Sequence, residues 1–290
     1  MMNKKIRLAA SFIALAALLA ACSGSKPAAS TSADAVATPE TPAVTDINTA
    51  APSSAVTEET AHSPAPEETV TEETVTEETA KLYRMNEVYR FVPIDDEELA
   101  KAVLLTFDDG PKSEDIIVSM LDTLDKHGAK AIFFVNGYRV EQNPELLKLI
   151  YERGFTIGNH SWDHINLKNE DRAVIERQIG DVQAKVEELT GAKPLFFRPP
   201  YGSGNDLVKS VAKDHGMLYM TWSNGSLDWD KSAAGKPEAV IQNVLDQLHP
   251  GANILMHELQ WTADALDELL TKLEEQGYRF IDPASIESIN

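Results

Sequence analysis

Hydrophobic and polar positions alternate along residues 81–290 in a pattern typical of an α/β protein. Short apolar runs predict strands, and stretches with an apolar residue every three or four positions predict helices between them. The predicted strands are residues 102–107, 131–135, 155–157, 195–198, 217–222, 254–257 and 278–281. The predicted helices are residues 116–127, 144–153, 170–189, 206–215, 237–248 and 263–276.

The predicted strands are nearly continuous apolar runs, such as AVLLTF at residues 102–107 and AIFFV at residues 131–135. Strands buried on both faces and separated by helices indicate a parallel sheet covered by helices. An open doubly wound sheet is the alternative. Polar clusters follow several different strands, and the carboxyl ends of strands converge on one face of a (β/α) barrel. We therefore predict an α/β fold, a distorted (β/α) barrel with about seven parallel strands, preceded by a disordered tether.

The first 22 residues have the features of a secretory signal. Three basic residues, Lys4, Lys5 and Arg7, precede an apolar run that is too short to span a membrane. The run ends in LAAC, which resembles a bacterial lipobox and implies cleavage before Cys22 and a diacylglycerol on its thiol. Cys22 is the only cysteine, so the chain has no disulfide framework and no thiolate metal site. A buried, small hydrophobic role for Cys22 is the alternative.

Residues 23–80 are rich in Ala, Thr, Ser, Pro and Glu and have almost no large apolar side chains. Such a segment cannot bury enough surface to offset its chain entropy, which predicts an extended, disordered tether. A partner-binding or O-glycosylated stalk is the alternative to a plain spacer. We therefore expect a lipoprotein signal peptide at residues 1–22, a tether at residues 23–80 and a folded domain at residues 81–290.

The distribution of charge argues against two kinds of partner. Residues 1–22 contain three basic residues, and residues 23–80 contain eleven acidic residues and one lysine, which leaves −13 of the formal net charge of −20 to residues 81–290. A domain this acidic is not expected to bind nucleic acid by neutralising phosphates, or an anionic bilayer through a basic face. Recognition must therefore depend on local groups in a cleft.

Two polar clusters follow the first and third predicted strands. TFDDGP places Asp108 and Asp109 directly after a buried strand, where adjacent carboxylates need neutralisation or a metal ion. A turn that caps the next helix is the alternative interpretation. In HSWDH, His160 and His164 are four residues apart, so on a helical turn both can reach one ion. Two histidines and one carboxylate form an open metal site, a ligand set that also suits non-haem ferrous oxygenases.

Three more clusters follow later strands. RPPYG forms a loop stiffened by two prolines, after which the Tyr201 N–H is a candidate oxyanion donor. WSNGSLDW places Asp228 beside Trp229, where the acid can orient a catalytic group and the ring can form a pocket wall. His257 ends the apolar strand LMH and is a candidate catalytic residue, with a satisfied core histidine as the alternative. By contrast, His127 and His215 each precede a glycine at a predicted helix end, where a structural role is expected.

In this order, TFDDGP, HSWDH, RPPYG, LDW and LMH resemble the five motifs of the polysaccharide deacetylase family, carbohydrate esterase family 4 or the NodB-homology domain. The resemblance implies a distorted (β/α) barrel and metal-dependent removal of N-acetyl groups from a polysaccharide. It implies metal binding by Asp109, His160 and His164. It also implies a general base, Asp108, oriented by Arg198; a general acid, His257, tuned by Asp228; an oxyanion donor, the Tyr201 N–H; and an acetyl-methyl pocket made by Trp229 and Leu255.

The resemblance further implies an extracellular glycan as substrate, with peptidoglycan N-acetylglucosamine expected first. N-acetylmuramic acid, poly-N-acetylglucosamine, chitin oligomers and O-acetylated xylan are alternative substrates, and a catalytically silent glycan-binding lipoprotein is the alternative function. Many family members have an acid at the position of Gly225, so we expect different substrate contacts there. The expected metal is Zn²⁺, with Co²⁺, Ni²⁺ or Mn²⁺ as alternatives. The chain is expected to be a monomer, lipid-anchored at Cys22 on the extracellular face of the membrane, in the cell-wall zone.

Overall fold

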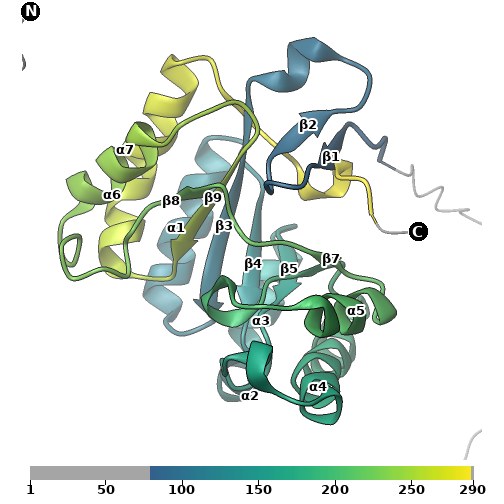
Figure 1. Ribbon diagram of the computed structural model, residues 1–290. Coiled ribbons are helices and arrows are strands. Elements are labelled where there is room, and N and C mark those ends of the chain that lie inside the picture. The colour runs from purple at the N-terminus through teal and green to yellow at the C-terminus, as the bar shows by residue number, and fades with distance from the viewer. Residues whose placement is uncertain (1–78, 289–290) are drawn as a thin grey trace, which may run out of the picture. The chain divides into compact units, whose positions relative to one another are not determined.

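The computed structural model of this chain describes residues 79–288 (Figure 1). The predicted signal peptide, the lipidation of Cys22 and nearly all of the predicted tether lie outside the described residues. The described strands are β1 (Tyr83–Met85), β2 (Phe91–Pro93), β3 (Ala102–Gly110), β4 (Ala131–Val135), β5 (Thr156–Asn159), β6 (Phe196–Phe197), β7 (Leu218–Tyr219), β8 (Asn224–Gly225), β9 (Ala252–His257) and β10 (Arg279–Phe280). The described α-helices are α1 (Glu114–Lys126), α2 (Gly137–Gln142), α3 (Pro144–Glu152), α4 (Arg172–Thr190), α5 (Asp206–Asp214), α6 (Pro237–Asp246) and α7 (Gln260–Glu275). Among residues 79–288, no helix is long and apolar enough to cross a membrane.

Parallel strands form the centre of the molecule. Seven of them follow one another in the order β7-β6-β5-β4-β3-β9-β8, and β10 pairs with the beginning of β3. The helices cover the outside of this sheet, α6 packing on α7, α7 on α1, α1 on α3, α3 on α4 and α4 on α5 (Figure 1). The predicted distorted (β/α) barrel is therefore confirmed.

The central strands are buried on both faces because their alternate side chains enter two different cores. Leu105 and Phe133 belong to the outer core, which contains the apolar faces of the helices. Leu104 and Phe134 belong to the inner core, which also contains Phe91 of β2. This arrangement explains why the strands are continuous apolar runs in the sequence.

The antiparallel pair of β1 and β2 was not predicted, because strands of three residues are too short to show a period. The pair lies at the amino end of the barrel, where the Phe91 N–H donates to the Gly251 carbonyl at 2.9 Å. Gly251 has a φ of 71°, and a Cβ at this position would lie 2.0 Å from the Phe91 carbonyl oxygen. Only glycine allows both the conformation and the close approach.

Residues 217–222 do not form the single strand that we predicted. The Met220 N–H donates to the Phe197 carbonyl of β6 at 2.9 Å, whereas the Ser223 N–H donates to the Asn253 carbonyl of β9 at 3.0 Å. The chain thus crosses from one edge of the sheet to the other, which leaves two short strands, β7 and β8, in place of one. This crossing brings the loop after β8 to the same end of the barrel as the loops after β3 and β9.

Candidate active site

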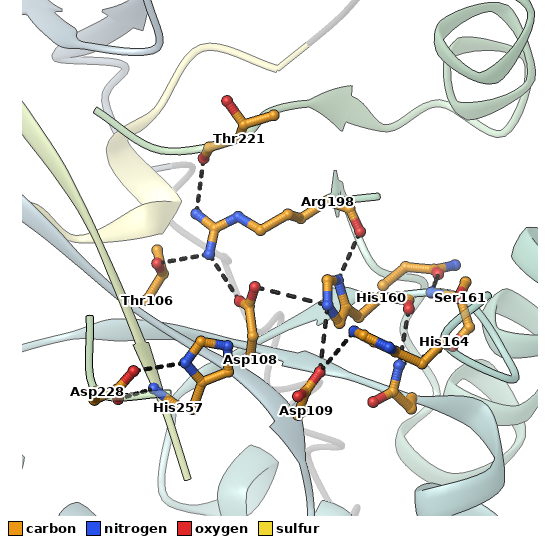
Figure 2. Close-up of polar contacts among 12 residues, drawn as sticks. Thr106, Asp108, Asp109, His160, Ser161, His164, Arg198, Thr221, Asp228 and His257 are labelled. Carbon is orange, nitrogen blue, oxygen red and sulfur yellow. Dashed lines mark hydrogen bonds and ion pairs between the residues drawn. The ribbon is translucent and has the colours of Figure 1, made fainter. Parts of the chain in front are cut away.

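The carboxyl ends of β3, β5, β6, β8 and β9 meet around one cleft of about 340 Å³. The cleft is lined by Asp108, Asp109, His160, His164, Tyr201, Gly202, Trp222, Trp229, Leu255 and His257. Eight of the ten predicted site residues within the described range are therefore at its surface. The other two, Arg198 and Asp228, are fully buried behind Asp108 and His257 (Figure 2).

Asp109 lies in a β-bulge at the end of β3. The register between β3 and β4 shifts between Asp108 and Gly110, and Asp109 has a φ of 70°. A regular strand would direct neighbouring side chains to opposite faces. Because the bulge changes this alternation, the carboxylates of Asp108 and Asp109 both line the cleft (Figure 2). The left-handed conformation costs a non-glycine residue about 1–2 kcal/mol, so surrounding contacts must hold it.

His160 and His164 approach Asp109 through an irregular loop, which corrects the helical turn that we predicted. Ser161 has a φ of 66° and His164 a φ of 55°, and neither residue is helical. The Nε2 atoms of His160 and His164 lie 3.4 Å and 3.2 Å from Oδ1 of Asp109. Two left-handed residues, and not helical spacing, therefore place both rings on the same carboxylate.

The donor set of Asp109, His160 and His164 fits a divalent metal ion. One ligand atom from each residue lies within 4.8 Å of the others, and the buried Oδ1 of Asp109 has no hydrogen-bond partner. Nδ1 of His160 lies 2.7 Å from the Arg198 carbonyl oxygen, so Nδ1 donates and Nε2 keeps its lone pair for an ion. Burial acts to raise the pKa of Asp109, but the two imidazoles lower it more and hold it well below its usual range. The carboxylate is therefore available as a ligand.

Arg198 fixes the orientation of Asp108 from the interior of the barrel. Its guanidinium donates to Oδ1 of Asp108 at 2.7 Å and to Oγ1 of Thr106 at 2.8 Å (Figure 2). Its other acceptors are the Thr221 carbonyl and Oδ1 of Asn253. Burial lowers the pKa of Arg198, and the charge of Asp108 acts in the opposite direction. Oδ1 of Asp108 is thus hydrogen-bonded to Arg198, while Oδ2 lies 3.7 Å from Nε2 of His160.

His257 is held by Asp228, which Thr262 holds in turn, near the Asp108 side of the cleft. Oδ1 of Asp228 lies 2.8 Å from Nδ1 of His257, and Oδ2 accepts the His257 backbone N–H and the Thr262 hydroxyl, each at 2.7 Å. Burial acts to lower the pKa of His257, but the hydrogen bond and charge of Asp228 raise it above its ordinary value of 6.5. His257 therefore keeps a second proton to higher pH than a free histidine does.

Aromatic and aliphatic side chains surround these polar groups. Tyr201 and Trp229 are 66% and 46% exposed at the rim, whereas Leu255 is 3% exposed inside the cleft. The Tyr201 ring contacts His164 edge-on at 4.7 Å between centroids, and Trp229 contacts His257 in the same way at 5.2 Å. The cleft thus offers flat apolar surfaces next to His164 and His257.

Three buried polar side chains that sequence reasoning missed hold the histidine loop. Nδ2 of Asn136 donates to the His160 carbonyl at 2.9 Å, and Oδ1 of Asn159 accepts the N–H two residues later at 3.0 Å. Gln178 on α4 accepts the Asp163 N–H at 2.8 Å and donates to its Oδ2 at 2.6 Å. The two asparagines lie at the carboxyl ends of β4 and β5, so their position could have identified them. The position of Gln178 gives no such signal, because this residue lies within the long helix α4 and not at the end of a strand.

Comparison with known proteins identifies the family. The model of the polysaccharide deacetylase family matches residues 95–220. PgdA of Listeria monocytogenes, a peptidoglycan-N-acetylglucosamine deacetylase, is 43% identical over 182 residues, which are 62% of this chain and 38% of PgdA. PdaA of Bacillus subtilis, a peptidoglycan-N-acetylmuramic acid deacetylase, is 34% identical over 182 residues, which are 62% of this chain and 69% of PdaA. The chain belongs to the polysaccharide deacetylase family, carbohydrate esterase family 4, as its motifs predicted.

A similar solved structure shows why membership does not by itself establish activity. A family 4 pseudoenzyme from Bacillus anthracis has a TM-score of 0.61 and 33% identity, covering 64% of this chain and 66% of that chain. The chain also matches only 38% of the length of PgdA. The function must therefore be argued from the side chains in the cleft.

Proposed function

We propose that this chain is a metal-dependent hydrolase that removes N-acetyl groups from peptidoglycan N-acetylglucosamine. The observation that carries the proposal is the presence of Asp108 and His257 beside the Asp109, His160 and His164 donor set in one cleft. Hydrolysis of an amide needs an activated water, a group that accepts its proton and a group that protonates the leaving nitrogen. The cleft contains a candidate for each requirement.

Asp109, His160 and His164 would hold the metal ion. A divalent ion held there would supply Lewis-acid chemistry, lowering the pKa of a water and polarising the acetyl carbonyl. Asp108, oriented by Arg198, accepts a proton as the water oxygen forms its bond to the carbonyl carbon.

The Tyr201 backbone N–H donates to the oxyanion that forms. A donor of this kind typically contributes about 3–4 kcal/mol to the transition state. Trp229 and Leu255 supply the apolar surface against which the acetyl methyl group would pack.

His257 supplies the proton that the leaving nitrogen needs. As the C–N bond breaks, the nitrogen takes the Nε2 proton, the sugar retains a free amine and the acyl group leaves as acetate. A sugar amine is a poor leaving group without this proton. Asp228 supports the step in two ways, because it holds Nδ1 at 2.8 Å and raises the pKa of the ring.

N-acetylglucosamine in peptidoglycan is the preferred substrate for two reasons. PgdA, which is named for that sugar, shares 43% identity with this chain, and the Tyr201–Gly202 pair resembles the glucosamine-type members. N-acetylmuramic acid is the second candidate, because PdaA shares 34% identity and the small Gly225 resembles the muramic-acid group. A Cβ at Gly225 would lie 3.5 Å from Trp229, in ordinary contact.

We also propose Zn²⁺ as the metal and a lipid anchor at Cys22 that keeps a monomeric enzyme at the extracellular face of the membrane. Two imidazoles and a carboxylate with open positions suit Zn²⁺, and Co²⁺, Ni²⁺ and Mn²⁺ are the alternatives. The support for the anchor is the LAAC sequence after a short apolar run.

Mass analysis of peptidoglycan fragments incubated with the metal-loaded chain tests the substrate. The expected result is loss of acetyl groups from N-acetylglucosamine. Loss of acetyl groups from N-acetylmuramic acid alone would identify that sugar, the second candidate, as the substrate. Binding of fragments without any loss of acetyl groups would support a silent glycan-binding lipoprotein.

A further inference from the structure

Glu258 directly follows His257, but the two side chains lie in different surroundings. His257 lines the cleft, whereas Glu258 is 2% exposed and contacts the loop that follows β3. Successive side chains of an extended segment point to opposite sides, which accounts for this division. A buried carboxylate is costly unless it is hydrogen-bonded, so its partners indicate what it does.

The partners of Glu258 are backbone amides before α1. Oε1 accepts the Lys112 N–H at 2.9 Å and the Ser113 N–H at 2.6 Å, and Oε2 also lies 2.9 Å from the Lys112 nitrogen. Ser113 is the N-cap of α1, but its own side chain makes no capping hydrogen bond. From the residue after β9, Glu258 therefore binds the beginning of α1, where a negative charge is also favoured by the helix dipole.

The same carboxylate packs closely against the turn that carries Asp108 and Asp109. A Cβ on Gly110 would lie 2.7 Å from Oε2 of Glu258, so the carboxylate occupies the space that a side chain at residue 110 would need. The preceding residue, Asp109, has the left-handed φ of 70° that requires support from its surroundings. Glu258 thus lies against Gly110, the residue directly after Asp109, and also accepts the N–H of Lys112, two residues further on.

We propose that Glu258 is a positioning residue that fixes the Asp108–Asp109 turn relative to His257. Strands β3 and β9 are paired as far as Asp108 opposite His257, and Glu258 joins them again just beyond this pair. Without the second connection, the turn can shift, which moves the base and a metal ligand relative to the acid. The expected effect of Glu258 on kcat rests on the proposed function. The expected effect of Glu258 on metal affinity does not.

The variants Glu258→Ala and Glu258→Gln, compared with Glu275→Gln at the exposed end of α7, test the inference. Metal affinity is measured by competition with a chelator, and kcat and KM are measured at saturating metal on an acetylated chito-oligosaccharide. Groups that hydrogen-bond metal ligands typically contribute about 10–100-fold to affinity or activity. Glu258 holds the turn through the backbone of Lys112 and Ser113, so Glu258→Ala should lose about 10-fold, the lower end of that range, in metal affinity and in kcat. Its KM should change little, because Glu258 does not line the cleft.

Glu258→Gln should show a smaller loss, because its amide oxygen can still accept the Lys112 and Ser113 N–H groups. Glu275→Gln should behave like the wild type. A purely structural role predicts a lower melting temperature with unchanged metal affinity and kcat in the folded protein, and this result would overturn the inference. If Glu258→Ala does not fold, Glu258→Gln decides: metal affinity equal to wild type overturns the inference, and weaker affinity supports it. A wild type that binds metal but deacetylates no glycan would contradict the proposed function and leave the affinity comparison valid.

Discussion

Oδ1 of Asp228 lies 2.8 Å from Nδ1 of His257, while Oδ2 of the same carboxylate accepts the His257 backbone N–H at 2.7 Å. One buried acid therefore fixes both the ring and the main chain of the proposed general acid. Because the Thr262 hydroxyl also donates to Oδ2, the carboxylate is itself held in place. This arrangement leaves Nε2 as the nitrogen that can act on substrate.

Asp228→Asn should shift the alkaline limb of the pH–rate profile to lower pH. As the proposed general acid, His257 must be protonated to act, so activity is expected to be full below its pKa and to be lost as pH rises through it. Asp228 raises this pKa, and the neutral amide removes that effect. Profiles of kcat/KM for the variant and for Asp230→Asn, an exposed acid two residues away, provide the measurement. An alkaline limb that stays in place in Asp228→Asn would mean that another group supplies the proton.

Asp108→Asn and Asp109→Asn should separate catalysis from metal binding. Asp108 contacts Arg198 and is not part of the donor set, so its variant should keep the ion and lose turnover by about 10²–10⁴-fold or more. Asp109 contributes a ligand atom, so its variant should lose metal and activity together. Elemental analysis of each purified protein, with His160→Ala as a second ligand variant, gives the occupancy. Full occupancy in His160→Ala or Asp109→Asn would refute the assigned metal site.

His257→Ala should affect an amide substrate more than an activated aryl acetate. The leaving group of an aryl acetate needs no proton, whereas a sugar amine does. The metal content should be unchanged, because His257 lies outside the donor set. Comparing kcat/KM on the two substrates measures the difference. Equal losses on both would assign His257 a structural role.

Cys22→Ser should abolish lipid attachment. The LAAC sequence predicts modification of the Cys22 thiol, the only thiol in the chain. Radioactive palmitate supplied to cells should label the wild type and not the variant, which should accumulate as an uncleaved or mislocalised precursor. Equal labelling of both proteins would rule out this anchor.

Much of the fold could be predicted from the local pattern of apolar and polar residues. AVLLTF and AIFFV are apolar on every position because β3 and β4 face two cores, and their lengths identify them as strands. One helix end also has a local signal: Gly191 follows the predicted helix at residues 170–189 and caps α4 with a φ of 76°. The polar clusters at strand ends then led to the cleft without any knowledge of tertiary contacts.

The remainder depends on contacts between distant segments. The crossing of residues 217–225 from β6 to β9 requires partners that the local sequence does not show. The left-handed φ of Asp109 arises in a β-bulge and that of His164 in a loop, and neither position has a glycine that would predict it. Gln178 and Glu258 matter through hydrogen bonds to residues far away in the chain, and nothing in their own neighbourhoods distinguishes them from ordinary helix or strand-end residues.

Acetate release from peptidoglycan tests the central claim most directly. Wild type and Asp108→Asn are compared at the same measured metal occupancy, so that the ion itself is held constant. The account predicts release of acetate by the wild type, with new free amines on the glycan, and a rate at least about 10²-fold lower for the variant. No acetate from the fully metal-loaded wild type, or equal rates from the two proteins, would contradict it.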